Sequence, residues 1–192
     1  MNNSKSQLNK SCYIIGYWQS EKYFKSINET ILNDFQLNIQ PDNYHINLAN
    51  QINNCNSVSV HVRRGDYLED EKINSVHGIL NNLYYYSSIE LITTLVGEPH
   101  LFFFSDDIDW VKNNFYLQFP HTFIDKDFLN KDSKDMWLMT QCKHNIIANS
   151  SFSWWGAWLN KNQDKIVIAP KNWFQNPKMN SDNIVPENWV RL

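Results

Sequence analysis

The sequence predicts an α/β protein in which helices cover both faces of a parallel β-sheet. Short, largely apolar runs alternate along the chain with longer segments in which apolar residues recur every three or four positions. Strands that are buried on both faces have such near-continuous apolar runs, and strands separated by helices pair in parallel. With 42% hydrophobic residues among 192, the chain also has enough apolar surface to bury a core.

The first three expected elements are a helix, a connector and a strand. Residues 20–35 are expected to form a helix because aromatic and aliphatic side chains recur there at three- and four-residue steps. Residues 40–56 are polar, contain a proline and many asparagines, and are expected to form a connector. Residues 57–62 alternate in polarity, but their valines and the Arg-Arg-Gly that follows indicate a buried strand ending in a functional turn.

The middle of the chain is expected to alternate between helices and strands. Residues 82–96 carry an apolar stripe that is followed by a glycine and a proline, which predicts a helix and its end. The continuous run LFFFS at 101–105 predicts a strand. Residues 107–114 are expected to form a short helix, because aspartates in a first turn interact favourably with the helix dipole, and 121–124 a brief strand.

The same alternation continues in the last third of the chain. A helix is expected at 133–142, with Ser133 as its N-cap, and a short apolar strand at 144–148. Residues 151–160 are expected to form the next helix. The run KIVIA at 165–169 predicts a final strand that a proline ends.

Composition narrows the function classes and the expected location. A net charge of -3 and a pI near 6.0 argue against a general nucleic-acid or anionic-membrane binder. Cys12, Cys55 and Cys142 are too few for a closed disulfide framework and are interpreted as reduced thiols. The polar N-terminus lacks the apolar stretch of a signal peptide, and no run is long enough to span a membrane. We therefore expect a cytoplasmic protein, with at most a peripheral association at the inner face of the membrane.

Ligands of parallel α/β sheets bind at the carboxyl ends of the strands, so the segments after each strand are the places to look. The first such segment carries Arg63 and Arg64, whose guanidinium forks match phosphate oxygens in pairs, and Gly65, which permits a tight turn. Asp66 could orient an arginine or accept a proton. An exposed salt-bridge cluster is the alternative, whereas a cell-adhesion Arg-Gly-Asp motif requires an exposed loop tip, not a strand end.

Two further segments carry polar residues at strand ends. Asp106 and Asp107 follow the second strand, where they could bind sugar hydroxyls, hold a metal, hold an arginine, or cap the next helix. A metal site is weakly supported, since no histidine or third carboxylate stands at a fixed offset. Asn149, Ser150 and Ser151 open a later helix, whose free N–H groups form an anion site.

The helix before that anion site begins near Asp135, whose carboxylate could accept paired hydrogen bonds from the N1–H and amino group of guanine. Three tryptophans follow within the later helix. They could stack on a sugar, but packing in the core is the favoured interpretation. These tryptophans are Trp154, Trp155 and Trp158.

Four ordered segments together resemble the motifs of bacterial α-1,2-fucosyltransferases, glycosyltransferase family 11. They are GYWQSEKYF at 16–24, HVRRGDY at 61–67, FSDD at 104–107 and NSSFSWWGAW at 149–158. The resemblance covers nearly the whole chain, from about Tyr13 onward. Any one of these motifs would be weak evidence, but four in the family's order are specific.

The resemblance implies an inverting, metal-independent transferase with two Rossmann-like domains, the arrangement called GT-B. Its donor would be GDP-β-L-fucose, which is a substrate, so no cofactor is expected. The acceptor would be the 2-hydroxyl of a galactoside in a glycan or surface polysaccharide. No nucleic-acid partner is expected.

The resemblance also assigns roles to individual residues. Arg63 would contact the β-phosphate, His61 would lie beside the nucleotide, and Asp135 would bind guanine. Ser150 and Ser151 would meet the phosphates. The expected donor-binding set is completed by Arg64, Asp106, Asp107 and Asn149.

Inversion requires a group that takes the proton of the acceptor hydroxyl. Asp66 is the first candidate for this general base, and Glu69 and Glu71 in the next few residues are the alternatives. With Arg63, Asp66 forms the expected catalytic pair.

The chain differs from the family in having no segment that resembles the glycine-rich GGLGNQMFQYA with which members begin. We therefore expect residues 1–56 to be a remnant of the acceptor-side domain with a connector. Residues 57–192 are expected to form the GDP-sugar-binding, Rossmann-like domain. Two functions follow as hypotheses: a fucosyltransferase, or a non-catalytic GDP- or sugar-binding module.

Overall fold

The computed structural model describes residues 13, 15, 20–38, 40–125 and 131–192, and it leaves the side chains of residues 66, 69 and 73 undescribed. Its strands form one parallel sheet in the order β3-β2-β1-β4-β5-β6. From the central strand β1 the chain first adds β2 and β3 on one side, and it then returns to add β4, β5 and β6 on the other side of β1. This is the Rossmann-like arrangement. The strands are β1 Ser57–Val62, β2 His100–Ser105, β3 His121–Phe123, β4 His144–Ile146, β5 Val167–Ala169 and β6 Val190–Arg191.

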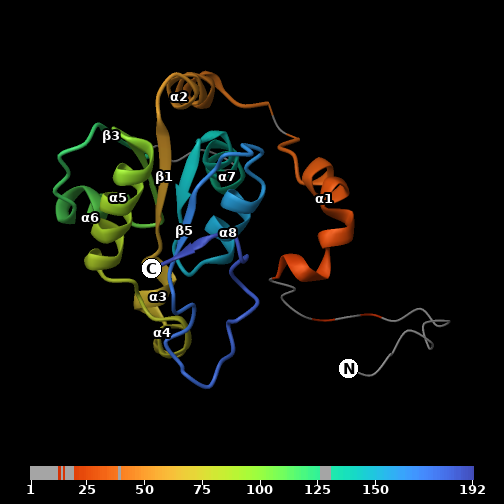
Figure 1. Ribbon diagram of the computed structural model, residues 1–192. Coiled ribbons are helices and arrows are strands. Elements are labelled where there is room, and N and C mark those ends of the chain that lie inside the picture. Colours follow the sequence, from red (N-terminus) through yellow and green to blue (C-terminus); the bar gives the residue numbers. More distant parts are fainter. Residues whose placement is uncertain (1–12, 14, 16–19, 39, 126–130) are drawn as a thin grey trace.

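Helices cover both faces of this sheet, as the sequence predicts. Helices α5 and α6 lie on one side, and α7 and α8 on the other (Figure 1). The short helices α3 and α4 lie at the end where β1 finishes (Figure 1). The helices are α1 Asn28–Asp34, α2 Asn43–Asn53, α3 Gly65–Glu69, α4 Glu71–His77, α5 Asn82–Val96, α6 Ile108–Asn114, α7 Lys131–Gln141 and α8 Ser151–Trp158.

The alternation of side chains along β2 divides the core into two layers. Phe103 packs with the cluster beneath α5 and α6, whereas Phe102 and Phe104 pack with residues of α2 and α7. All three phenylalanines are buried. A strand that is apolar on both faces needs helices on both sides, and this confirms the α/β fold class predicted from the run LFFFS.

The prediction of a connector at 40–56 is wrong, because residues 43–53 form helix α2. The side chain of Asp42 caps this helix by accepting the backbone N–H of His45 at 3.1 Å. Leu48 and Ile52 stand one turn apart and are buried against the core. The asparagines occupy the other positions, so their number concealed a helical spacing of the apolar residues.

Other boundaries also differ from the predicted ones. Residues 20–35 are not one helix: two 3-10 turns, Glu21–Tyr23 and Lys25–Ile27, precede α1. Ser133 is not an N-cap, because α7 already begins at Lys131. The two short helices α3 and α4 and the edge strand β6 were not predicted, since each is too short to carry a periodic apolar pattern.

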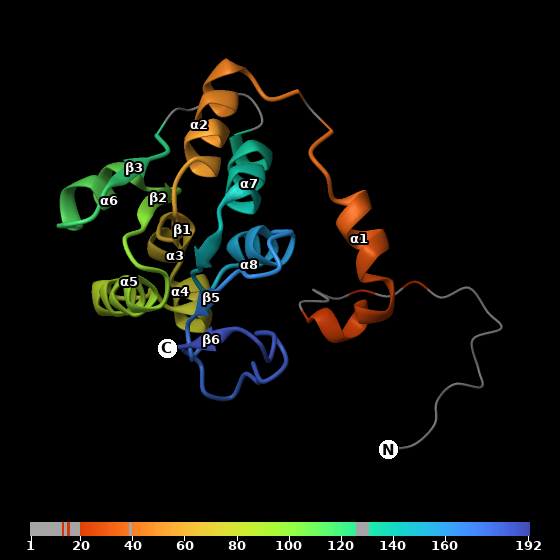
Figure 2. The same cartoon turned by 45° about the horizontal axis from the view of Figure 1, so that its top comes forward.

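The three tryptophans of α8 pack in or against the core, as favoured from the sequence: Trp154 is buried, and the other two are partly buried against it. Trp154 is fully buried and donates its indole N–H to the carbonyl of Ile184 at 2.8 Å. Trp155 stacks on Phe24, with ring centroids 5.5 Å apart, and on Phe35 at 5.2 Å. These contacts hold α1 on the side of α8, away from α5 and α6 (Figures 1 and 2). In the described part of the chain, no helix is both long and apolar enough to cross a membrane.

Candidate functional site

A cleft of about 1240 Å³ lies at the carboxyl ends of the strands. Residues that follow β1, β2, β4 and β5 line it, together with the first turn of α7. Six residues that the sequence predicts for the site are part of the lining: His61, Arg63, Asp106, Asp135, Ser150 and Ser151. A second hollow, of about 1030 Å³, lies between the end of α1 and α7 and is lined by none of the predicted site residues.

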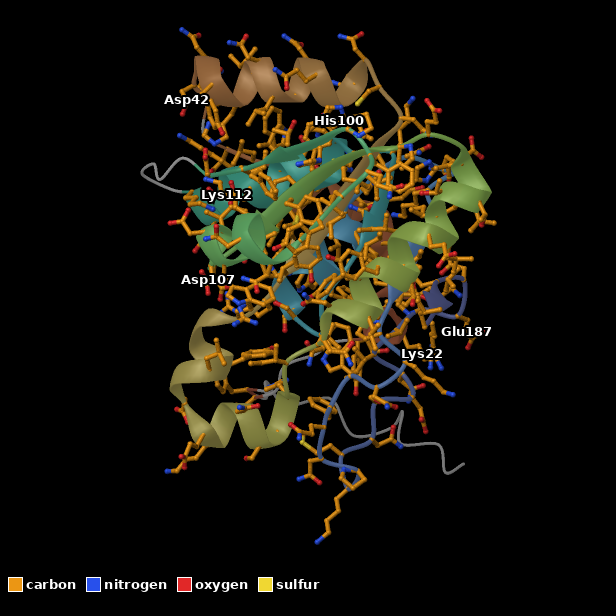
Figure 3. All side chains as sticks on the ribbon, turned by 90° about the vertical axis from the view of Figure 1, so that its left-hand side faces the viewer. Lys22, Asp42, His100, Asp107, Lys112 and Glu187 are labelled. Atoms are coloured by element: carbon orange, nitrogen blue, oxygen red, sulfur yellow. The ribbon has the colours of Figure 1, made fainter. Side chains whose placement is uncertain are left out.

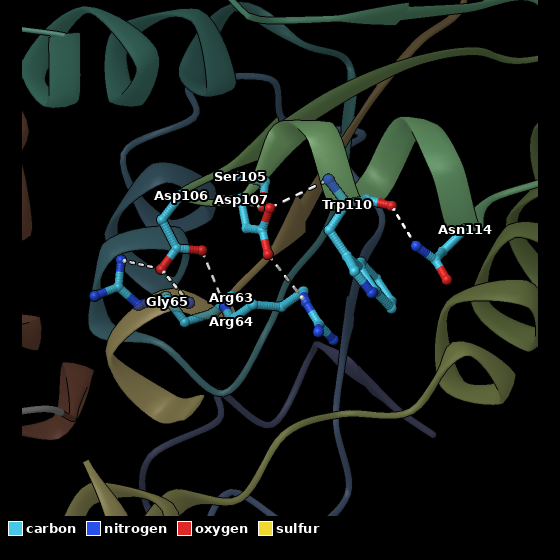
Figure 4. Close-up of polar contacts among 8 residues, drawn as sticks. All are labelled: Arg63, Arg64, Gly65, Ser105, Asp106, Asp107, Trp110 and Asn114. Carbon is cyan, nitrogen blue, oxygen red and sulfur yellow. Dashed lines mark hydrogen bonds and ion pairs between the residues drawn. The ribbon is translucent and has the colours of Figure 1, made fainter. Parts of the chain in front are cut away.

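Arg63 is fixed at the end of β1 by Asp106 at the end of β2. Its Nη1 lies 3.2 Å from Asp106 Oδ2. The same carboxylate accepts the backbone N–H groups of Arg64 and Gly65, each at 2.9 Å (Figure 4). A Cβ at Gly65 would lie 2.8 Å from Asp106 Oδ2, so only glycine permits this close approach. Asp106 therefore caps α3 and orients the arginine at once.

Arg64 points the opposite way from Arg63 (Figure 4). Its guanidinium lies 3.4 Å from the ring centroid of Trp110, and its Nε is 3.6 Å from Asp107 Oδ2. Asp107 also caps α6 by accepting the backbone N–H of Trp110 at 3.2 Å. Neither Arg64 nor Asp107 is part of the cleft lining. They join β1 to α6, and a role in donor binding stays a prediction.

Asn149 likewise connects segments around the cleft without lining it. Its Nδ2 donates to the carbonyls of His77 at 2.8 Å, Gly78 at 3.2 Å and Trp173 at 3.3 Å. The backbone carbonyl of Asn149 accepts a hydrogen bond from the hydroxyl of Tyr67 at 2.9 Å. Asn149 therefore positions the turn at which α8 starts.

The start of α8 faces the cleft. Ser150 is the N-cap residue and Ser151 is the first residue of the helix, and both are part of the cleft lining. The first N–H groups of a helix lack partners within the helix, and its dipole favours negative charge there. Together with Arg63, this helix start offers the cleft a positively polarised rim.

His61 is only 3% exposed and lies beneath the cleft. Burial, together with the positive charges of Arg63 and Lys131, lowers its pKa to about 3. The imidazole is therefore neutral at physiological pH. Its Nδ1 is buried and makes no hydrogen bond with the described residues, so it can serve a ligand as a donor or acceptor.

Asp135 is 4% exposed and lies in the first turns of α7. One carboxylate oxygen, Oδ2, forms an ion pair with Lys131 one turn earlier. The other, Oδ1, is buried and has no hydrogen-bond partner among the described residues. Burial raises the pKa of this carboxyl, and Lys131 acts against that rise. A buried acceptor without a partner is rare in a folded protein, so Oδ1 is a candidate for contact with a ligand.

The candidates for the general base are not brought into the cleft by any described contact. Asp66 and Glu69 belong to α3, and their side chains lie outside the described residues. Glu71 begins α4, is exposed, and is not part of the cleft lining. The assignment of Asp66 as base stays a prediction. Cys12 and residues 16–19 of the first motif also lie outside the described residues.

Sequence reasoning missed several residues of the cleft. Lys131 stands four residues before Asp135, and this helical spacing of opposite charges is a signal that could have found it. Tyr67, His77 and Phe174 line the cleft from segments far apart in the chain, and no local pattern connects them. Among the described side chains, no three histidines, cysteines or acids gather closely enough to hold a metal ion.

Comparisons of the sequence with known proteins identify a family and several relatives. The family described as glycosyl transferase family 11 matches residues 2–192. The O-antigen biosynthesis glycosyltransferase WbnK of Escherichia coli is 36% identical over 100% of this chain and 64% of its own length. The alpha-1,2-colitosyltransferase of Escherichia coli is 42% identical over 95% of this chain and 63% of its own length.

A more distant relative is the galactoside 2-alpha-L-fucosyltransferase of Caenorhabditis elegans. It is 27% identical over 92% of this chain and 51% of its own length. The chain thus spans 64% or less of the length of these three relatives.

Proposed function

The chain belongs to glycosyltransferase family 11, and we propose that its cleft binds GDP-β-L-fucose for transfer of the fucosyl group to the 2-hydroxyl of a galactoside. One observation carries the proposal. Arg63, held by Asp106 at 3.2 Å, and the start of α8 line the same cleft. Both groups attract a diphosphate, and they come from neighbouring strand ends, where α/β sheets bind nucleotides.

The diphosphate is the part of the donor that gains negative charge as the sugar departs. A fixed guanidinium and backbone N–H groups stabilise this charge in the transition state without having to reorganise. Arg63 is fixed in this way, because Asp106 holds both its side chain and the turn behind it. In the proposed reaction, Arg63 and the N–H groups at Ser150 and Ser151 bind the leaving GDP.

In this proposal, guanine binds at the end of the cleft that Lys131 and Asp135 line. The N1–H and amino group of guanine are adjacent donors, whereas adenine has no such pair. Asp135 offers the unpartnered Oδ1 to one donor, and the other donor reaches Oδ2 beside Lys131. Neutral His61, whose Nδ1 is free of described partners, supplies a further hydrogen bond to the nucleotide.

The transfer itself is a single in-line displacement. The oxygen of the acceptor hydroxyl bonds to the anomeric carbon of fucose while the bond from that carbon to the phosphate oxygen breaks. The hydroxyl proton goes to a carboxylate, for which Asp66 is our first choice and Glu69 and Glu71 are the alternatives. GDP leaves with the bonding electrons, so the anomeric configuration inverts. The proposed reaction needs no metal, since Arg63 and the start of α8 neutralise the leaving group.

The relatives favour a second donor and one class of acceptor. Colitose is fucose without its 3-hydroxyl, and the 42% identical colitosyltransferase makes GDP-colitose the alternative donor. The O-antigen glycosyltransferase favours a bacterial surface polysaccharide as the acceptor. Parallel assays with GDP-fucose and GDP-colitose, each with lactose as the acceptor, distinguish the two donors.

Replacing Arg63 by alanine tests the proposed phosphate site. Hydrogen bonds to charged groups contribute about 1.5–3 kcal/mol, so the Arg63→Ala variant is expected to bind GDP roughly tenfold to a hundredfold more weakly. Calorimetry in EDTA measures this, and replacing EDTA by Mg²⁺ should leave the affinity unchanged. Lys161→Ala, which removes an exposed cation beyond the far end of α8, is the control and should bind GDP as the wild type does.

Equal affinities in the wild type and in Arg63→Ala contradict the phosphate assignment. GDP binding without transfer from either donor supports the alternative function, a non-catalytic nucleotide-binding module. Affinity for GDP that depends on Mg²⁺ contradicts the metal-independent mechanism.

A further inference from the structure

A row of three aromatic rings extends through the cleft from Arg63. The guanidinium of Arg63 lies 5.8 Å from the ring centroid of Tyr67. The ring of Tyr67 stacks on that of His77, with centroids 5.2 Å apart and planes at 20°. The ring of His77 meets that of Phe174 at 5.4 Å. All three rings line the cleft, and the proposed nucleotide interactions use none of them. Tyr67 is only 7% exposed, so the half-buried rings of His77 and Phe174 supply most of the accessible aromatic surface.

This aromatic row lies on the opposite side of Arg63 from the proposed guanine site. Lys131 and Asp135 follow β3, whereas Phe174 follows β5, and β1 with Arg63 stands between those strands in the sheet. The lining near the row is uncharged. It is completed by Ser20, Tyr23, Val76, Met179, Asn180, Asn183 and Ile184. The two ends of the cleft therefore differ in chemistry, with charges at one end and rings and amides at the other.

Hydrogen bonds hold this end of the cleft in place. The backbone N–H of Gln175 donates to the carbonyl of Val76 at 2.9 Å, which fixes Phe174 beside His77. Gly78, with a φ of 66°, allows the close approach, because a Cβ there would lie 2.7 Å from Gln175 Oε1. A site whose walls are already joined binds a ligand without a large ordering cost.

The N-terminal turn completes the wall from the other side. Lys22 Nζ donates to Asn183 Oδ1 at 2.7 Å and lies 3.6 Å from Glu187 Oε1 (Figure 3). The first contact engages the side-chain carbonyl of Asn183, a residue of the cleft lining. Tyr23, the residue after Lys22, lines the cleft as Asn183 does.

An uncharged sugar is the ligand that this end of the cleft fits. Sugar rings present C–H groups on one face and hydroxyls around the edge, so they pack on aromatic rings and hydrogen-bond to amides. Pockets with aromatic walls and a few placed polar groups are typical of such ligands. A phosphate or a nucleobase edge, by contrast, is matched by the charged groups at the other end.

We propose that the aromatic row of Tyr67, His77 and Phe174, with Tyr23 and Asn183 at its edge, is the platform on which the acceptor galactoside lies. The inference rests on the proposed function, which places the leaving diphosphate at Arg63. Because the row begins at Arg63, an acceptor on it lies next to the place where the proposed function puts the leaving diphosphate. Phe174 is then a residue that determines acceptor binding and leaves nucleotide binding unaffected.

The experiment measures lactose binding and GDP binding separately. Saturation-transfer NMR on the GDP-saturated protein should show lactose bound, with Phe174→Ala weakening it about tenfold, as expected for loss of one aromatic contact. Calorimetry should give Phe174→Ala the GDP affinity of the wild type. Phe174→Tyr keeps the ring and should keep lactose binding. Tyr116→Ala, which removes an exposed ring outside the cleft, is the control.

A measurement on the unaltered protein covers the case in which Phe174→Ala fails to fold. Selective saturation of aromatic protons should transfer to the galactose ring protons of lactose more strongly than saturation of methyl groups. Stronger transfer from the methyl groups overturns the proposal.

Two further results overturn the platform without affecting the proposed function. One is GDP binding with no lactose binding by the wild type. The other is a Phe174→Ala variant that loses GDP affinity and keeps lactose, which assigns the row to the nucleobase. A wild type that does not bind GDP refutes the proposed function, and the acceptor platform with it.

Discussion

Two buried polar clusters lie on the same sheet, and they differ in whether their polar atoms have partners. The first, which we call the closed network, joins Ser59 of β1, Asn145 of β4 and Asn160 beyond α8. The second comprises His61 of β1 and Asp135 of α7 in the cleft. All five side chains are buried, so burial alone does not distinguish a structural cluster from a ligand site.

The closed network satisfies its members internally. Asn145 Nδ2 donates to Ser59 Oγ at 2.6 Å and to the carbonyl of Met139 at 3.0 Å. Asn160 Nδ2 donates to Asn145 Oδ1 at 2.8 Å and to the carbonyl of Cys142 at 2.7 Å. These bonds connect β1, α7, β4 and the end of α8, and they leave no amide hydrogen of Asn145 or Asn160 for a ligand.

In the cleft, by contrast, His61 Nδ1 and Asp135 Oδ1 are buried without partners among the described residues. Each unpaired buried group costs free energy, about 1–3 kcal/mol, so folding alone does not explain them. Binding of a ligand with matching donors and acceptors does explain them. Tyr85 Oη and Ser88 Oγ of α5, outside the cleft, are also buried without a described partner, so unsatisfied burial indicates a ligand site only where, as at His61 and Asp135, the residue also lines a cleft.

The largest effect is expected on stability, from breaking the closed network. Asn145→Leu keeps the branched shape of the side chain but leaves Ser59 Oγ, the carbonyl of Met139 and one amide N–H of Asn160 without their partner. Three buried groups that lose a partner predict a loss of at least about 3 kcal/mol, which urea unfolding measures. GDP affinity of the folded fraction should stay that of the wild type. A variant that unfolds like the wild type contradicts the structural role of this network.

The next effect concerns binding, not stability. Asp135→Asn turns an acceptor of the cleft into a mixed donor and acceptor, so one donor of guanine faces an amide N–H group. GDP affinity should fall roughly tenfold to a hundredfold, the loss of one hydrogen bond to a charged group. The free energy of unfolding should change little, because the relief of burying a carboxylate is offset by the loss of its ion pair with Lys131.

ADP is the matched ligand control for this variant. It lacks the paired donors of guanine, so its weak binding should not change between the wild type and Asp135→Asn. If wild-type protein binds ADP as tightly as GDP, Asp135 does not select the base.

The sequence predicts the strands and the location of the cleft because both depend on local patterns. The valines of β1 and the phenylalanines of β2 show which segments are buried, and the predicted and observed bounds of β1 and α5 coincide. A parallel sheet then collects the residues that follow its strands at one edge. This is why Arg63, Asp106 and Ser150 meet in one cleft although they are far apart in the chain.

The remaining features depend on contacts that no local pattern contains. Arg63 and Arg64 are neighbours of the same type, yet only Arg63 lines the cleft, because Asp106 holds one and Asp107 with Trp110 the other. The asparagines of the closed network look like surface residues in the sequence. Their burial follows from the way that β1, α7, β4 and the end of α8 meet.

The smallest effect sharpens the interpretation of His61 as a neutral, buried ring. Its folded pKa of about 3 lies below the ordinary value of 6.5, so the unfolded chain binds a proton there that the folded chain does not. Above pH 6.5 His61 is neutral in both states and does not lower the free energy of unfolding. As the pH falls from 6.5 toward 3, protonation of His61 in the unfolded chain lowers that free energy progressively. Between pH 6.5 and 5.5 the wild type should lose about 1 kcal/mol more than His61→Gln, which cannot take up the proton.

Unfolding by urea at several pH values in that window measures this difference. The other titrating groups around the cleft, among them Asp106, Lys131 and Asp135, are common to both proteins and largely cancel. His121→Gln, which removes an exposed ring at the opposite end of the sheet, should follow the wild type. If His61→Gln loses stability with falling pH as steeply as the wild type, His61 is protonated in the folded protein. It then presents a positive charge to the nucleotide, and the cleft is more cationic than the comparison with the closed network implies.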